Sequence, residues 1–258
     1  MPRFAANLTM LFTEVPMLDR PSLAAQAGFD GVEVLFPYDH SAADWQAALS
    51  GQPLALINAP PGDWLAGDRG FAAVPGEEAR FRDSFLRGAD LADRLGAHRL
   101  HIMAGVARGP QAEQVFAENL NWAAAQAPNQ RLVIEPLNPD DMPGYFLNDF
   151  DLAARILDDL DLPQVQIQFD LWHAARIEGH AQAVWDRHKA RVGHIQIAGF
   201  PARNEPGGGG FDLTGLCAEV DAMAYDGWIA AEYRPARATV HGLAWLSALK
   251  ARSQPIGT

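Results

Sequence analysis

The sequence predicts a single (β/α)8 barrel, and three observations lead to that fold class. Short apolar runs alternate with amphipathic stretches along the whole 258-residue chain. Several of these runs are continuously apolar, which is typical of parallel strands covered on both faces. Eight strand-helix units in about 250 residues match the usual size of such a barrel. Since no linker divides the chain, we expect one domain over residues 1–258.

The expected strands are short and evenly spread. They are Phe4–Leu8, Gly31–Leu35, Leu54–Asn58, Arg99–Met103, Leu132–Glu135, Val165–Asp170, Val192–Ile197 and Trp228–Glu232. A doubly wound sheet usually has a glycine-rich loop after its first strand, whereas residues 7–12 contain no glycine. The barrel is therefore the preferred architecture.

The segments between the strands have helical patterns and a recurrent ending. Apolar residues recur at helical spacing over residues 81–92, and Gly96 follows where the helix should end. Gly28 occupies the same place before the second strand. Ala224 stands there before the eighth strand, so this is a recurrent unit rather than a strict repeat.

Composition excludes several classes of function. A formal charge of −12, without any run of Lys and Arg, argues against nucleic acid as a partner. The lone Cys217 excludes an internal disulfide and is expected to be a small buried side chain. No apolar run approaches the ~20 residues needed to cross a bilayer, and the first residues lack a basic leader pattern. We expect a cytoplasmic protein, without a membrane partner, that could form a homo-oligomer.

Oxygen-bearing side chains end four late strands. Glu135, Asp170, Gln196 and Glu232 lie at or near the carboxyl ends of the fifth to eighth strands. In such barrels the chemistry occurs at that face. Three converging carboxylates would repel one another, and a divalent cation removes this difficulty. The oxygen ligands favour Mg²⁺ or Mn²⁺, so we expect these four residues to bind one of the two.

Longer motifs carry a resemblance to a known family. The chain resembles the hydroxypyruvate isomerase family of the xylose-isomerase-like barrels, and within it the branch acting on 2-oxo-tetronate. The motifs are Ile134-Glu135-Pro136-Leu137-Asn138, the segment 141–147, His194-Ile195-Gln196-Ile197-Ala198, Arg203-Asn204-Glu205-Pro206-Gly207 and the segment 227–233. The resemblance implies the same four metal ligands and implies that Glu135 and Glu232 are the acid/base pair. Asn204 departs from the family, whose members usually have His there.

The resemblance implies a metal-dependent isomerase of a small hydroxy-oxo acid. The substrate would be hydroxypyruvate or a four-carbon 2-oxo or 3-oxo acid, and a glutamate would move the proton through an enediolate. For substrate binding we expect His173, three residues beyond Asp170, and Arg203, which could pair with a carboxylate. Arg69, on a turn after the third strand, could close over the site.

Several nearby residues allow two interpretations. Glu33 could support the site from behind or be an exposed strand end, and His194 could be a site residue or an inner histidine with its hydrogen bonds satisfied. His101 is expected in the core rather than as a ligand. Tyr38, Trp64 and Trp172 follow strand ends and could exclude water, although aromatic residues there more often serve packing.

Three alternative functions remain open on the same barrel. A ketose 3-epimerase would share the Glu/Asp/Glu pattern but usually has His where Gln196 stands. A base-lesion endonuclease would need several metals, many His ligands and a basic DNA face, against eight His and the negative charge of this chain. A non-catalytic metabolite-binding barrel would be expected to lose one of the two glutamates.

Overall fold

Eight parallel strands pair in chain order, and the last pairs with the first to close a barrel. The strands are β1 (Phe4–Asn7), β2 (Gly31–Val34), β3 (Leu54–Asn58), β4 (Arg99–His101), β5 (Leu132–Ile134), β6 (Val165–Asp170), β7 (Val192–Ile197) and β8 (Ile229–Ala231). This computed structural model describes residues 2–207 and 211–252. The predicted (β/α)8 fold is confirmed.

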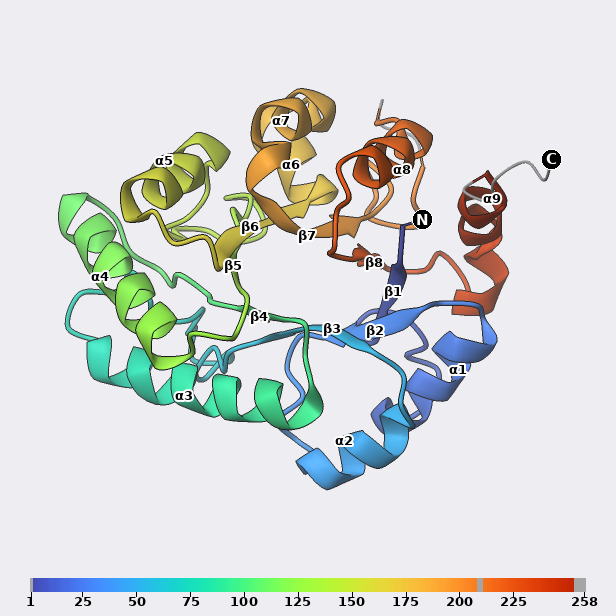
Figure 1. Ribbon diagram of the computed structural model, residues 1–258, viewed down its shortest axis with the longest axis horizontal. Coiled ribbons are helices and arrows are strands. Elements are labelled where there is room, and N and C mark those ends of the chain that lie inside the picture. Colours follow the sequence, from blue (N-terminus) through green and yellow to red (C-terminus); the bar gives the residue numbers. More distant parts are fainter. Residues whose placement is uncertain (1, 208–210, 253–258) are drawn as a thin grey trace.

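Helices form an outer ring around the barrel (Figure 1). They are α1 (Arg20–Gln26), α2 (Ala42–Leu49), α3 (Glu78–Leu95), α4 (Pro110–Gln126), α5 (Phe150–Leu160), α6 (Leu171–Glu178), α7 (Ala181–His188), α8 (Leu213–Ala222) and α9 (Ala244–Arg252). Both α6 and α7 lie between β6 and β7. Helices on the outside and side chains on the inside bury both faces of each strand, which explains the continuous apolar runs.

Side chains and backbone conformation set the helix ends, and the ending predicted at Gly96 is observed. Ser41 and Asp44 form a reciprocal capping box at the start of α2. Asp149 accepts a hydrogen bond from the Leu152 amide and begins α5. Gly96 ends α3 at φ 66°, a left-handed conformation that glycine adopts without a steric penalty.

One end of the barrel is filled by a tryptophan. Trp228, which precedes β8, is buried and packs with Ala5, Ala55 and Ala230. A Cβ atom on Gly31 would lie 2.7 Å from the indole ring, so glycine is required for this close approach. Since these residues lie at the amino ends of their strands, the opposite end is left for a cavity.

The predicted strands differ from the observed ones mainly at their carboxyl ends. β5 ends at Ile134 and β8 at Ala231, so Glu135 and Glu232 lie one residue beyond their strands instead of closing them. Cys217 is buried, as expected. Over residues 2–207 and 211–252, no helix combines the length and apolarity that crossing a membrane requires.

The helix ending without glycine leads to a stability prediction. Ala224 adopts φ 50° and is exposed, in the place that Gly28 and Gly96 occupy elsewhere. Because a Cβ atom is disfavoured in this conformation, Ala224→Gly should raise the free energy of unfolding by about 0.5–1 kcal/mol. The matched control is Ala218→Gly at an exposed position inside α8, which should lower it by about 1 kcal/mol. Urea unfolding of both variants measures the difference, and destabilisation by both would contradict the prediction.

Candidate active site

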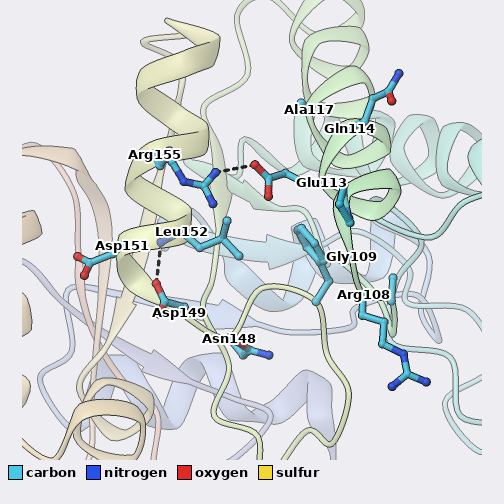
Figure 2. Close-up of a pocket in the computed structure, with 13 residues that line it drawn as sticks. Arg108, Gly109, Glu113, Gln114, Ala117, Asn148, Asp149, Asp151, Leu152 and Arg155 are labelled. Carbon is cyan, nitrogen blue, oxygen red and sulfur yellow. Dashed lines mark hydrogen bonds and ion pairs between the residues drawn. The ribbon is translucent and has the colours of Figure 1, made fainter.

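Two cavities differ in what lines them. The larger, of about 1010 Å³, lies on the outer surface between α4 and α5 (Figure 2). There Arg155 pairs with Glu113 at 2.5 Å, and both side chains are about half exposed. Asp149 is engaged in capping α5. Arg155 and Glu113 thus satisfy each other at the surface, and no buried polar cluster converges on this groove among the described residues.

The second cavity, of about 540 Å³, opens at the carboxyl ends of the strands. Each of the eight strand ends, or the segment that follows it, contributes to its wall: Thr9, Phe36, Asn58, Met103, Glu135, His173 (in α6), Arg203 and Glu232. This is the position at which barrels of this type perform their chemistry. It is therefore the candidate active site.

Three carboxylates gather at this end of the barrel. Asp170 is 0% exposed, and Glu135 and Glu232 are each 5% exposed. Burial raises the pKa of Glu135 well above its usual value, and the negative charges of Glu232 and Asp170 raise it further. Burial also raises the pKa of Asp170 to about 6 and that of Glu232 to about 8. Such a cluster needs positive charge nearby to remain ionised.

Arg203 supplies one positive charge. Its guanidinium donates to Asp170 Oδ2 at 3.0 Å and to Glu232 Oε1 at 2.8 Å. Although burial lowers it, Asp170 and Glu232 hold the pKa of Arg203 above its ordinary value. The residue adopts φ 53° in the loop after β7, and its guanidinium contacts the side chains of Asp170, at the end of β6, and Glu232, after β8. Arg203 therefore lies within the carboxylate cluster, and one cation faces three acids.

Gln196 lies behind the cavity in a network of amides and carboxylates. Its Nε2 donates to Glu33 Oε1 at 2.8 Å and to Glu232 Oε2 at 2.5 Å, while its Oε1 accepts from Gln168. Asn7 Nδ2 donates to the same two carboxylates, each at 2.8 Å. The structure thus brings Gln196 into contact with Glu232 through a hydrogen bond.

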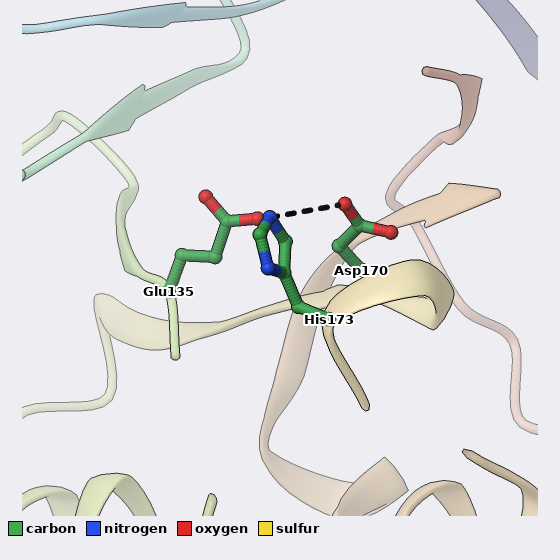
Figure 3. Close-up of side chains that lie close together, drawn as sticks. All are labelled: Glu135, Asp170 and His173. Atoms are coloured by element: carbon green, nitrogen blue, oxygen red, sulfur yellow. Dashed lines mark ion pairs between the residues drawn. The ribbon is translucent and has the colours of Figure 1, made fainter. Parts of the chain in front are cut away.

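The tautomer of His173 follows from its neighbours. The backbone N–H of Asn138 donates to His173 Nδ1 at 3.0 Å, so this nitrogen carries a lone pair. Burial lowers the pKa of His173 to about 3, so the ring is neutral and its proton lies on Nε2. Figure 3 shows Nε2 directed towards Asp170, whose Oδ2 lies 3.6 Å away. His173 can therefore donate a hydrogen bond towards the site.

The acidic cluster fits a hard cation. One ligand atom each from Glu135, Asp170 and His173 lies within 4.8 Å of the others, in a fully buried position. Glu135 Oε1 is buried and has no hydrogen-bond partner among the described residues. Oxygen donors with net negative charge suit Mg²⁺ or Mn²⁺. The His173 Nε2 proton makes that nitrogen a hydrogen-bond donor rather than a metal ligand.

Other residues singled out in the sequence have clear positions. Arg69 lines the cavity, with its guanidinium 3.7 Å from the centre of the Trp64 ring. Glu33 is fully buried and binds His194 at 2.7 Å, so the exposed-strand-end interpretation of Glu33 is wrong. His194 is fully buried beside it. His101 is buried as expected, but it also forms part of the cavity wall.

The aromatic residues divide between the cavity wall and the packing around it. Trp64 and Trp172 line the cavity. Tyr38 instead donates a hydrogen bond from its hydroxyl to the Asn58 carbonyl, where it supports the wall from outside.

Sequence reasoning missed three polar residues. Asn138 fixes the His173 ring, Asn7 bridges Glu33 and Glu232, and Arg234 lines the cavity. Asn138 stands in the Glu-Pro-x-Asn motif and Asn7 ends the first strand, so a search of every strand end for amides would have found both. The inward direction of Arg234 has no local signal.

Comparisons with known proteins agree with this geometry. A family model described as xylose isomerase-like TIM barrel matches residues 21–249. The chain is 45% identical over 254 residues to the 2-oxo-tetronate isomerase of Cupriavidus necator, covering 95% of this chain and 98% of that protein. It is 38% identical over 254 residues to the hydroxypyruvate isomerase of Escherichia coli, with the same coverage.

A solved structure matches the whole fold. A crystal structure from Brucella melitensis, titled AP endonuclease, family 2, superposes with a TM-score of 0.91 at 39% identity. The match covers 96% of this chain and 99% of that one. With the family model spanning nearly all of the barrel, the chain belongs to the xylose isomerase-like TIM barrel family.

Proposed function

We propose that the protein is a metal-dependent isomerase of a small hydroxy-oxo acid. In the reaction, the carbonyl group and the hydroxyl group on the neighbouring carbon exchange places. The substrate pair is hydroxypyruvate and tartronate semialdehyde, or the 2-oxo and 3-oxo forms of a tetronate. The observation that carries the proposal is the buried cluster of Glu135, Asp170 and Glu232 at the carboxyl ends of the strands. The printed names of the two isomerase relatives support it.

Glu135, Asp170, Gln196 and Glu232 would hold the cation, Mg²⁺ or Mn²⁺. When bound, such an ion would offset the carboxylate charge and stabilise the negative charge that develops on the substrate oxygens. For Gln196 to be a ligand, its amide must turn so that Oε1 faces Glu232, where Nε2 lies now. The exchange of O and N in one amide requires no movement of the backbone.

Glu135 and Glu232 would move the proton. They follow β5 and β8 and both line the cavity, so they reach a substrate from two directions. One glutamate takes the proton from the hydroxyl-bearing carbon, and a glutamate returns a proton to the former carbonyl carbon. The hydroxyl proton passes to the other oxygen, so the reaction is balanced. Their raised pKa values suit groups that both accept and release protons.

His173, Arg203 and Arg69 would bind the substrate. The Nε2 proton of His173 can be donated to a substrate oxygen. Arg203 and Arg69 both line the cavity and provide cationic groups for a carboxylate. We also propose a cytoplasmic location for the protein.

Nucleic acid is not part of this proposal, although the Brucella relative has an endonuclease title. The charge of −12 would repel a phosphate backbone. The cavity of about 540 Å³ has the size of a small-molecule site.

Glutamate-to-glutamine changes test the proton transfer. Glu135→Gln or Glu232→Gln removes the base but keeps an oxygen for the cation, so kcat should fall by at least ~100-fold. Isomerisation and solvent-deuterium incorporation measure the effect, with metal content determined for each variant. Glu113→Gln, on the exposed groove between α4 and α5, is the matched control and should keep wild-type rates. Wild-type proton exchange in both metal-loaded site variants would contradict the assignment.

The raised pKa values predict how cation binding depends on pH. Because Asp170 and Glu232 bind protons more tightly when folded, they stabilise the metal-free protein below about pH 4. That contribution disappears as the pH rises through about 6 and then about 8. A cation binds the ionised carboxylates, so the increase in Tm with Mn²⁺ over EDTA should grow from pH 5.5 to pH 8.

The increase in Tm caused by the cation should be large enough to measure. Cation at 100 times its Kd adds about 2.7 kcal/mol, or roughly 5–10 °C for a domain of this length. Asp170→Asn should lose most of the increment, and Glu113→Gln should keep it. An increment of the same size at both pH values, or none at all, would refute the cation site as described.

A further inference from the structure

Two polar side chains lie next to each other on the wall formed by β3 and β4. Asn58 and His101 are direct partners in the parallel ladder, and each is the last residue of its strand. They are 4% and 1% exposed, and both line the cavity. Neighbouring strands are about 4.8 Å apart, so one small group can contact both side chains.

Neither side chain is satisfied by the protein. Asn58 Oδ1 and both ring nitrogens of His101 are buried and have no hydrogen-bond partner among the described residues. The carboxylate closest to His101 is that of Glu135, at 3.9 Å from Nδ1, which is too long for a hydrogen bond. Buried polar groups are usually paired, and an unpaired one is costly. A ligand that pairs with them would recover this cost.

Two polar side chains elsewhere in the barrel, by contrast, have protein partners. His173 is held by Asn138, and Asn7 donates to two carboxylates. The acidic residues that line the cavity, Glu135, Asp141 and Glu232, all follow β5 or β8. The proposed reaction uses the acidic cluster and gives Asn58 and His101 no role, so these two side chains are available to bind another part of the substrate.

The unpaired atoms define the group that would fit. Asn58 Oδ1 only accepts a hydrogen bond, and a neutral imidazole donates one and accepts one. A hydroxyl both donates and accepts, so it can donate to Asn58 Oδ1 and accept from the protonated nitrogen of His101 at the same time. In the observed orientation of the Asn58 amide, a carboxylate, which has no donor, would leave Asn58 Oδ1 unpaired. In that orientation the pair favours a hydroxyl over a carboxylate.

We propose that Asn58 and His101 form a subsite for a substrate hydroxyl that takes no part in the reaction. This inference rests on the proposed isomerase function and narrows its substrate class. In hydroxypyruvate the single hydroxyl is a reacting group, so none is left for the subsite. A four-carbon dihydroxy-oxo acid has a further hydroxyl at its terminal carbon. The subsite therefore favours the four-carbon acid.

The subsite is tested by comparing two substrates in the wild type and in two variants. The two compounds are the four-carbon 3,4-dihydroxy-2-oxo acid and its 4-deoxy analogue, assayed with Mn²⁺. For the wild type, kcat/KM should be roughly 10- to 100-fold higher for the hydroxylated compound, because the analogue leaves buried groups unpaired. In His101→Leu and Asn58→Leu this ratio should fall below about 3-fold.

Controls separate recognition from folding. Met103→Leu changes an apolar residue of the same wall and should keep the wild-type ratio. Since the His101 ring has no protein partner, the unliganded His101→Leu variant should retain the wild-type Tm or exceed it. His194→Leu should lower Tm, because it leaves the buried Oε2 of Glu33 without its hydrogen-bond partner.

The outcomes are distinguishable. An active wild type whose preference for the hydroxylated acid is unchanged in both Leu variants overturns the subsite alone, as does a wild type without that preference. A metal-loaded wild type that isomerises neither these compounds nor hydroxypyruvate overturns the proposed function, and the subsite with it.

Discussion

Buried negative charge at the open end of the barrel is the constraint on which the site depends. Glu33, Glu135, Asp170 and Glu232 are all at most 5% exposed. Water cannot stabilise these carboxylates, so the protein must do so with hydrogen-bond donors and positive charge. Arg203 meets two of them, and the amides of Asn7 and Gln196 each donate to two. Much of the polar structure around the cavity follows from this requirement.

The same contacts fix the positions of the reacting groups. Asp170 begins α6 by accepting from the Trp172 amide with Oδ1, while its Oδ2 binds Arg203. A side chain held at both oxygens cannot rotate away from the site. Glu232 is held similarly by Asn7, Gln196 and Arg203. Glu135 has an oxygen with no partner among the described residues, so it is the less constrained glutamate.

The fold could be predicted from sequence because each strand is a short apolar run buried on both faces, a pattern that hardly depends on distant residues. Parallel strands in a closed barrel also bring their carboxyl ends together, so Glu135, Asp170, Gln196 and Glu232 could be grouped. Two hydrogen bonds could not be predicted: the one from the Asn138 backbone N–H to His173, and the one from Arg203 to Asp170. Both depend on loop conformations, such as φ 53° at Arg203, whose carbonyl accepts a hydrogen bond from the backbone N–H of the distant Arg234.

The pairing of β1 with β8 has a consequence for how the molecule is made. Asn7 and the Glu232 carboxylate that it contacts are separated by 225 positions, nearly the whole chain. During synthesis from the N-terminus, this ladder is the last that can form. Until β8 has left the ribosome, Glu232 cannot join Glu135 and Asp170 at the open end of the barrel. The complete acidic cluster can therefore assemble only at the end of synthesis, although Glu135 and Asp170 come from the neighbouring strands β5 and β6.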